Sequence, residues 1–386
     1  MIDTMAAPGA PLSRRLFLKG VGAWAVASLM AGASASLAGC DFRSWSAATV
    51  EVEDMLGRRV AVPEVCARVF CTNPIGTANV YMLCPDRLAG WNFKPAGDNQ
   101  KYLEASSLEL PSLGVWMGAG AVPNAEEVAA QSPDVLLCFW TCDEVGGTMA
   151  DDIAQTTRIP TLLIDYDIRS TPASFRYLGR LLGCEERAEL LASYCEDKLA
   201  QIARIAETVP EQNRKSIFLA QGADGLTTDP VGSMHVQDAL DIIGVTNVAD
   251  MPGTEGQGMG MPTVNLEQVV AWNPDAVLVA EFNMSDAESS DIYHGLCQDV
   301  HWANVPCVAA GEVYRIPQGP FSWFGRPPSA ARLLGCTWLL KVLYPDQAVS
   351  VDMRREVEDF YALFYGFTDF DDDLMERLLG PAEGMG

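Results

Sequence analysis

The residues best suited to bind a ligand gather in one proline-stiffened segment, residues 317–328. This segment places Arg326 close behind two aromatic residues, Trp323 and Phe324. A guanidinium can form bidentate hydrogen bonds to carboxylates or oxyanions, and a planar aromatic side chain can stack on a macrocycle or a catechol. We therefore predict that all three residues contact a ligand. The alternative is that the segment only packs against the helix expected at residues 329–343.

Three further tryptophans lie in loops at the ends of predicted strands. Trp91, Trp116 and Trp140 each fall at such a position. Ligands of open α/β sheets bind in the crevice beyond the carboxyl ends of the strands. We predict these side chains as additional ligand contacts, with local packing as their alternative role.

The three histidines are scattered along the sequence. Proteins that bind bare zinc or manganese usually gather several histidines and carboxylates, whereas His235, His294 and His301 form no such group. Structural roles are therefore expected, and the residues that would hold a metal remain unknown. The alternative for His235, which follows a Gly-Ser-Met segment, is a single axial contact to iron.

Eleven cysteines occur, and none forms a C-x-x-C pair or has zinc-finger spacing. Most are expected to be small buried residues. One or two disulfides remain possible in an oxidising compartment, but the sequence does not pair the cysteines.

Composition and charge exclude several classes of function. The formal net charge of −25 argues against nucleic-acid binding and against broad adhesion to an anionic membrane. No nucleophile elbow, P-loop or H-E-x-x-H motif appears. We therefore predict neither an enzyme nor a resident cofactor.

The N-terminus is typical of an exported lipoprotein. Residues 13–19, SRRLFLK, have the pattern of a twin-arginine signal, and a weakly apolar stretch then ends in Leu-Ala-Gly-Cys40. This ending resembles a lipobox, so Cys40 is predicted to carry the lipid. A transmembrane helix is the alternative, but the stretch contains few strongly apolar residues. The mature protein would sit on the outer face of the cytoplasmic membrane, at the cell surface or in the periplasm.

An internal repeat indicates two related halves. Residues 124–137 match residues 265–278 at a constant offset of 141, without a gap. Each copy has an asparagine suited to cap a helix, followed two positions later by a glutamate, Glu126 or Glu267. A proline then ends the helix, and the next apolar run suits a strand buried on both faces of a parallel sheet. Each copy is therefore a helix-turn-strand unit.

The predicted fold is α/β, with two Rossmann-like lobes bridged by one long helix and a ligand cleft between them. An antiparallel hairpin is expected at residues 49–53 and 60–63, and the long helix at 185–208. The other predicted strands cover residues 68–72, 87–91, 135–140, 161–165, 216–221, 245–248, 276–280 and 313–316. The predicted domains are a signal at 1–40, a tether at 41–48, an N-terminal lobe at 49–180, the bridging helix at 181–210 and a C-terminal lobe at 211–386.

The chain resembles the substrate-binding proteins of ABC importers for siderophores, haem and vitamin B12, the class III periplasmic binding proteins. The resemblance covers residues 49–345 and is carried by the hairpin segment DMLGR at 54–58, DRLAG at 86–90, EVYRIP at 312–317 and both repeat copies. In that family each lobe presents an acidic residue to the permease. The resemblance therefore implies docking roles for Glu126 and Glu267, although both could simply stabilise helix starts, and the adjacent Glu127 leaves the register open by one.

The resemblance implies a metal complex as cargo and the permease and ATPase subunits of an importer as partners. The aromatic residues place a ferric siderophore or haem first among the ligands and a corrinoid second. A tetrahedral oxyanion such as molybdate, served by Arg326 and helix N-termini, comes third. A ligand sensor or storage protein with the same fold is the remaining alternative.

Overall fold

The computed structural model describes residues 48–116, 122–251, 261–281 and 292–379. The predicted export signal with Cys40, and residues 41–47 of the tether, lie outside the described residues. None of the described helices is long and apolar enough to cross a membrane.

The first half of the described chain forms a parallel sheet in the order β3-β4-β5. Its strands are β3 (Val69–Cys71), β4 (Val135–Trp140) and β5 (Thr161–Asp165). The predicted antiparallel hairpin precedes this sheet and consists of β1 (Thr49–Glu53) and β2 (Arg59–Pro63). The helices of this half are α1 (Pro74–Leu83), α2 (Ala105–Leu108), α3 (Ala125–Ala130), α4 (Glu144–Thr157) and α5 (Thr171–Leu182).

The second half forms another parallel sheet, in the order β7-β6-β8-β9. Its strands are β6 (Ser216–Ala220), β7 (Thr246–Asn247), β8 (Ala276–Val279) and β9 (Val313–Arg315). The helices between them are α7 (Gln237–Ile243), α8 (Leu266–Trp272), α9 (Ile292–Gln298) and α10 (Pro306–Ala309). Short 3-10 helices cover Pro85–Arg87, Gly97–Tyr102, Ile168–Ser170, Glu211–Asn213 and Trp302–Asn304.

One predicted strand, at residues 87–91, is wrong. Leu88 makes a single parallel bridge to Val69, whereas Trp91 bridges to Ser112. The segment changes partner at Gly90, where the backbone runs so close to Pro111 that a Cβ would lie 2.9 Å from the Pro111 carbonyl oxygen. No ladder can therefore extend along either neighbour.

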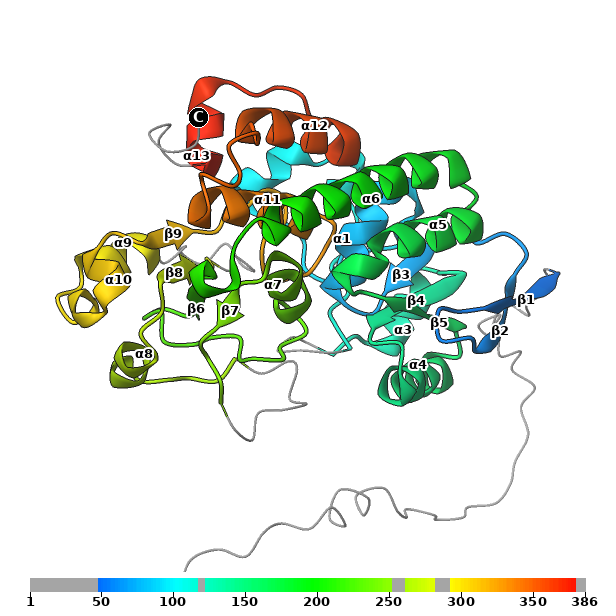
Figure 1. Ribbon diagram of the computed structural model, residues 1–386. Helices are drawn as coiled ribbons and strands as arrows, with labels where there is room; N and C mark the ends of the chain where they lie inside the picture. Colours follow the sequence, from blue (N-terminus) through cyan, green and yellow to red (C-terminus); the bar gives the residue numbers. More distant parts are fainter. Residues whose placement is uncertain (1–47, 117–121, 252–260, 282–291, 380–386) are drawn as a thin grey trace, which may run out of the picture. The chain divides into compact units, whose positions relative to one another are not determined.

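The long helix α6 (Glu185–Glu207) forms where the sequence predicts it, between the two halves. It packs along α5 and also contacts α7, α1 and the later helix α11 (Ala331–Leu343) (Figure 1). At the crossing with α5, a Cβ on Gly179 would lie only 2.3 Å from Ala188 Cβ, so a glycine is needed for the two helices to approach. Leu191, Cys195 and Ile202 form the buried stripe of α6.

One apolar cluster, which we call the central cluster, receives side chains from both sheets. It contains Leu137 of β4, Leu219 of β6, Leu191 of α6, Leu333 of α11 and Phe360 of α12 among its fully buried members. Successive residues of a strand point to opposite faces. One face of each sheet therefore packs into the central cluster, and the other needs a separate cover.

Separate helices cover the outer faces of the two sheets. Leu136 of β4 packs with Val128 of α3 and Ile153 of α4. Phe218 of β6 packs with Val269 of α8 and with Trp302. Both sheets are thus buried on two faces, which explains their nearly continuous apolar strand sequences.

The last three helices return toward the first half of the chain. They are α11 (Ala331–Leu343), α12 (Met353–Tyr365) and α13 (Asp372–Leu379). Phe360 of α12 packs edge-on against Tyr194 of α6, and Lys198 forms an ion pair with Glu356. Arg187 Nη2 also donates to the Leu363 carbonyl oxygen at 2.6 Å. The domain boundary at residue 211 stays a prediction, and the structure adds that α12 packs on elements before it.

The internal repeat has the same local structure in both halves. Asp134 precedes β4 and its Oδ2 accepts hydrogen bonds from the backbone N–H groups of Ala67 (2.8 Å) and Arg68 (2.9 Å), next to β3. Asp275, the equivalent residue before β8, accepts from Ser216 N at 2.7 Å and Ser216 Oγ at 2.9 Å, at the start of β6. Each carboxylate thus joins the start of its own strand to the start of a neighbouring one.

We expect Asp134→Ala and Asp275→Ala each to lower the free energy of unfolding by about 1–3 kcal/mol, because each leaves strand-start donors without their acceptor. Urea unfolding monitored by circular dichroism measures the change. Asp152→Ala, at an exposed position of α4, should stay within about 0.5 kcal/mol of wild type. Equal stability of all three variants would show that the carboxylates of Asp134 and Asp275 do not stabilise the strand starts.

Candidate ligand-binding site

A buried polar cluster forms where β6 ends, and we call it the Asp229 cluster. Asp229 is completely buried. Its Oδ1 accepts hydrogen bonds from Arg326 Nη2 at 2.6 Å and Ser233 Oγ at 2.7 Å. Its Oδ2 accepts from Gln221 Nε2 at 2.7 Å and Arg326 Nε at 3.3 Å. Asn247 Nδ2 completes the cluster by donating to the Asp229 carbonyl oxygen at 2.8 Å.

The topology of the second sheet brings these residues together. Gln221 directly follows β6, Asn247 ends β7, and Arg326 lies in the segment after β9. Because β6 and β9 both run parallel to β8, their carboxyl ends meet at one edge of the sheet. The loop after β6 turns at Gly222, whose φ of +74° suits glycine and whose Cβ would lie 2.6 Å from Thr227 Oγ1.

The Asp229 carboxyl and the Arg326 guanidinium are both charged at neutral pH. Burial raises the pKa of Asp229, but the charge of Arg326 and the hydrogen bonds from Arg326 and Ser233 outweigh burial and lower this pKa below its ordinary 3.8. The Arg326 side chain is 13% exposed. Its Nη1 makes no hydrogen bond to any described residue. The predicted ligand contact of Arg326 stays a prediction, and the structure adds the buried partner that orients its side chain.

His235 lies in the same region and has no partner for its ring. It is 7% exposed, and neither ring nitrogen forms a hydrogen bond within the described part of the chain. Burial, together with the nearby charge of Arg326, lowers the pKa of His235 from 6.5 to about 3. The imidazole is therefore neutral at pH 7 and offers one donor and one acceptor. Because a buried polar group without a partner is unfavourable, a ligand group that satisfied either nitrogen would gain binding energy.

A second buried ion pair ties this region to the first half of the chain. Asp238 of α7 accepts hydrogen bonds from Arg332 Nη1 at 2.5 Å and from Ile168 N at 2.7 Å. Arg332 Nη2 donates to the Tyr166 carbonyl oxygen at 2.9 Å. The charges of both ion pairs act on His235. The loop after β5 is thereby held against α7 and α11.

Sequence reasoning missed Asp229, Asp238 and Arg332. Arg332 carried a usable signal, because it stands inside a strongly apolar helix and a buried charge requires a partner. The two aspartates carried none, since each pairs with an arginine more than 90 positions away.

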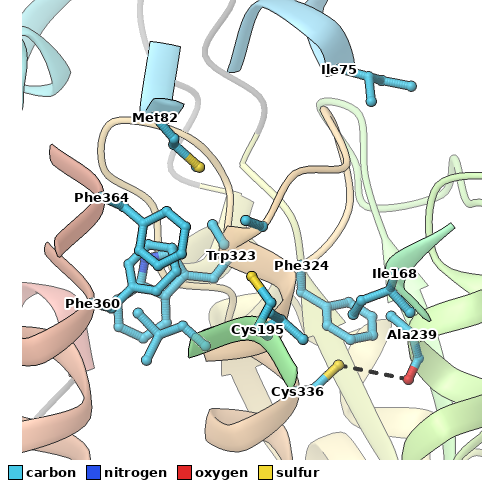
Figure 2. Packing of buried hydrophobic residues seen from close by; sticks show 14 of the residues in the cluster. Ile75, Met82, Ile168, Cys195, Ala239, Trp323, Phe324, Cys336, Phe360 and Phe364 are labelled. Carbon is cyan, nitrogen blue, oxygen red and sulfur yellow. Dashed lines mark hydrogen bonds between the residues drawn. The ribbon is translucent and has the colours of Figure 1, made fainter. Parts of the chain in front are cut away.

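Three of the predicted aromatic contacts are completely buried. Trp91, Trp323 and Phe324 have no accessible surface, and Figure 2 shows Trp323 and Phe324 among the residues of the central cluster. Trp323 Nε1 donates to Tyr361 Oη at 3.1 Å, and Trp91 Nε1 donates to the Ser107 carbonyl oxygen at 2.7 Å. A side chain in this position cannot touch a ligand unless the core opens. Their burial supports the alternative role of packing, so we leave them out of the candidate site, and their predicted ligand contacts stay predictions.

The other two tryptophans are half-buried and lie over the outer face of the first sheet. Trp116 and Trp140 both pack against the apolar cluster formed by Cys138, Ala150 and Leu163. Trp116 also lines a surface groove of about 560 Å³ that runs along α4. Arg326 belongs to the Asp229 cluster instead, so the six predicted contacts do not form one group. The predicted ligand contacts of Trp116 and Trp140 stay predictions.

The strand-end asparagines of the first half have structural roles. Asn73 caps α1 by accepting from Gly76 N at 3.2 Å, and its Nδ2 donates to the Phe139 carbonyl oxygen at 2.8 Å. Asn92 Nδ2 donates to the carbonyl oxygens of Cys71 and Gly114. These amides hold the loops at the carboxyl edge of the first sheet in place.

Glu126 and Glu267 occupy equivalent exposed positions in α3 and α8. The preceding asparagines cap these helices, with Asn124 Oδ1 accepting from Glu126 N at 3.0 Å and Asn265 Oδ1 from Gln268 N at 2.8 Å. Neither glutamate side chain has a hydrogen bond or ion pair to another described residue. Their docking role stays a prediction, and their carboxylates are available to a partner.

Known proteins resemble this chain in sequence and in fold. A family model described as "Periplasmic binding protein" matches residues 111–320, more than half of the chain. The structure of an ABC transporter solute binding protein from Sulfurospirillum deleyianum superposes with a TM-score of 0.76 at 27% identity, covering 86% of this chain and 99% of that one. These matches confirm the predicted fold class of two α/β lobes.

Two curated relatives match over shorter segments. The molybdate-binding protein MolA of Haemophilus influenzae is 34% identical over 106 residues, 28% of either chain. Its molybdate-bound structure superposes with a TM-score of 0.64 at 19% identity, covering 84% of this chain and 100% of that one. The ferric enterobactin-binding protein FepB of Escherichia coli is 33% identical over 102 residues, 26% of this chain and 31% of FepB. The sequence matches thus span less than a third of either relative.

We expect His235→Gln to flatten the pH dependence of stability in acid. The pKa of His235 is about 3 in the folded protein, below its ordinary 6.5. Between pH 6.5 and pH 3, the unfolded chain therefore binds a proton at His235 that the folded chain does not. The stability that neutral His235 contributes is therefore present above about pH 6.5 and is lost as pH falls, by up to about 1.4 kcal/mol per pH unit. Urea unfolding at pH 7, 6 and 5 compares the slopes.

The control for this experiment is His301→Gln, at an exposed position, which should keep the wild-type slope. A His235→Gln curve parallel to wild type across this range would show that His235 is not held neutral in the folded protein.

Proposed function

Because the chain belongs to the periplasmic binding protein family, we propose that it is the extracytoplasmic substrate-binding component of an ABC importer. The observation that carries the proposed site is the Asp229 cluster together with His235. It places an oriented guanidinium and an unpaired neutral imidazole at the carboxyl edge of a parallel sheet, where α/β proteins bind ligands. We propose no catalytic role.

A small anionic metal–oxygen species fits this site best. Asp229 accepts hydrogen bonds from Nε and from one N–H of Nη2 of Arg326. The second N–H of Nη2 and both N–H groups of Nη1 remain as donors for an oxyanion. His235 can donate from one ring nitrogen, or coordinate a metal through the other. We therefore place a molybdate-type oxyanion first. The relative from H. influenzae, which is named for molybdate binding, supports this choice.

A ferric siderophore or haem, ranked first from the sequence, becomes the second candidate. That ranking depended on stacking aromatics, and burial leaves Trp91, Trp323 and Phe324 without a face for stacking. Trp116 and Trp140 keep exposed surface and support an iron complex, as does the relative named for ferric enterobactin. A corrinoid needs still larger exposed apolar faces and ranks below both.

Transport also needs an anchor and a docking surface. In the proposed role, a lipid on Cys40 holds the protein at the outer face of the cytoplasmic membrane. Glu126 and Glu267 then meet basic sites on the two halves of the permease, whose ATPase subunits drive uptake. Their exposure, their equivalent positions in the repeat and their lack of partners among the described residues support this role. A sensor or storage protein would not need this pair of carboxylates.

We expect the purified protein to bind one molybdate per chain, detected by native mass spectrometry with metal analysis and by titration calorimetry. The double variant Arg326→Gln with Asp229→Asn should bind roughly tenfold more weakly or worse, because it removes one charge-assisted contact. The double change is preferred to Arg326→Ala, which would leave the Asp229 carboxylate buried without a partner and destabilise the fold.

Arg355→Gln is the matched control for the loss of one positive charge, since Arg355 is exposed on α12. It should bind like wild type. The same titrations with a ferric tricatecholate, haemin and cobalamin rank the other ligands. Wild-type affinity for molybdate in the folded double variant would exclude Arg326 from the site, and tight binding of the ferric complex alone would put the second candidate first.

We expect Glu126→Ala combined with Glu267→Ala to leave ligand affinity unchanged and to abolish uptake by cells that contain the cognate permease and ATPase. Uptake of labelled ligand measures the effect. Glu144→Ala with Glu312→Ala removes two other exposed carboxylates and should keep wild-type uptake. Normal uptake by the first double variant would rule out the docking role.

A further inference from the structure

Two cysteines far apart in the sequence meet at a junction of two helices. Cys84 is the C-terminal cap of α1, and its backbone N–H donates to the Val80 carbonyl oxygen at 2.8 Å. Cys184, exactly one hundred positions later, is the N-terminal cap residue of α6. The two helices contact each other, and both side chains belong to or pack against the central cluster.

The backbone around both cysteines is held independently of the thiols. Arg187, in the first turn of α6, donates from Nη2 to the carbonyl oxygen of Met82 at 3.1 Å and to that of Leu363 at 2.6 Å. Cys184 N donates to the Gly179 carbonyl oxygen at 2.9 Å. The end of α1 and the start of α6 are therefore fixed next to each other by bonds that do not involve sulfur.

The two thiols lie at the same helix junction and influence each other electrostatically. The neighbouring Cys184 thiol and burial together raise the pKa of the Cys84 thiol. Cys84 is only 6% exposed, whereas Cys184 is partly exposed. Cys184 is thus the sulfur that an external oxidant reaches first, and its thiolate would be the nucleophile in thiol–disulfide exchange.

We propose that Cys84 and Cys184 form a disulfide that links the end of α1 to the start of α6 once the protein meets an oxidising environment. Both are thiols in this structure. The setting of the proposal, an oxidising compartment, rests on the proposed extracytoplasmic role, but the pairing rests on the junction of α1 and α6, where Arg187 and the shared cluster hold the two cysteines. The pair Cys71 and Cys138 differs in this respect. Cys71 and Cys138, on neighbouring strands, belong to apolar clusters on opposite faces of the first sheet.

The reaction is an exchange with a disulfide oxidant of the protein or glutathione class. The Cys184 thiolate attacks one sulfur of the oxidant, which forms a mixed disulfide and releases the first oxidant thiol. Cys84 then loses its proton and attacks the Cys184 sulfur, which releases the second oxidant thiol. Two protein thiols and one oxidant disulfide become one protein disulfide and two oxidant thiols, so the two electrons and two protons pass to the oxidant.

The test uses the full chain, reduced and then equilibrated with oxidised glutathione. Unreacted thiols are blocked with N-ethylmaleimide before tryptic digestion and mass spectrometry. We expect a linked peptide containing Cys84 and Cys184, and a melting temperature that falls by roughly 5 °C when a reductant is added, since the link closes a long loop. This comparison needs no variant, so it does not depend on the folding of a mutant.

Cys84→Ser and Cys184→Ser should each lose the linked peptide and the effect of reductant on the melting temperature. Cys297→Ser, which changes an exposed cysteine, should retain both. Blocked thiols at positions 84 and 184 in the folded, fully oxidised wild type, or linkage of either to another cysteine, would overturn the proposal. Because no ligand takes part, this outcome is independent of whether the proposed transport role holds.

Discussion

The structure depends on burying both faces of two parallel sheets. Every strand of such a sheet needs cover above and below, and here one cover is shared. Leu137 of the first sheet and Leu219 of the second enter the same central cluster, and Leu191 of α6 lies between the halves in sequence and in the same core. The shared core makes the long helix part of both halves. It also explains why α12, the penultimate described helix, packs against α6 through Phe360.

Burial also requires the charged side chains inside the core to have partners. A buried charge without a partner is strongly unfavourable, so the charged residues at the carboxyl edge of the second sheet occur as pairs. Asp229 holds Arg326, and Asp238 holds Arg332 while also accepting from the backbone of Ile168. The first pair orients a guanidinium that still has unused donors. The second pair fastens the loop after β5 to α7 and α11. The binding chemistry and the connection between the halves thus use the same kind of interaction, a buried ion pair with extra hydrogen bonds.

His235 lies in the same region and belongs to no ion pair. Its ring nitrogens have no partner among the described residues, while both ion pairs act on it electrostatically. Such a group is a candidate for ligand binding, which is the role we propose for His235. On the surface, Glu126 and Glu267 occupy the same acidic position in the two repeat units. Two equal charges at equivalent positions suit a partner that is itself built from two related halves.

Most helices and strands, and their grouping into two related halves, could be predicted from the sequence, because helix caps, proline breaks and apolar strand runs are local signals. The repeat at Asp134 and Asp275, and the helix from Glu185 to Glu207, follow from such signals. Most residues of the candidate site could not be predicted from the sequence. The sequence around a loop tryptophan does not show whether its side chain faces a ligand or the core. In the structure, Trp323 is buried beneath α12. Likewise, Asp229, the partner of Arg326, lies 97 positions away in the sequence. The two residues come together only when the second sheet forms. Tertiary structure decided which side chains meet, because burial and ion pairing join residues that no sequence spacing connects.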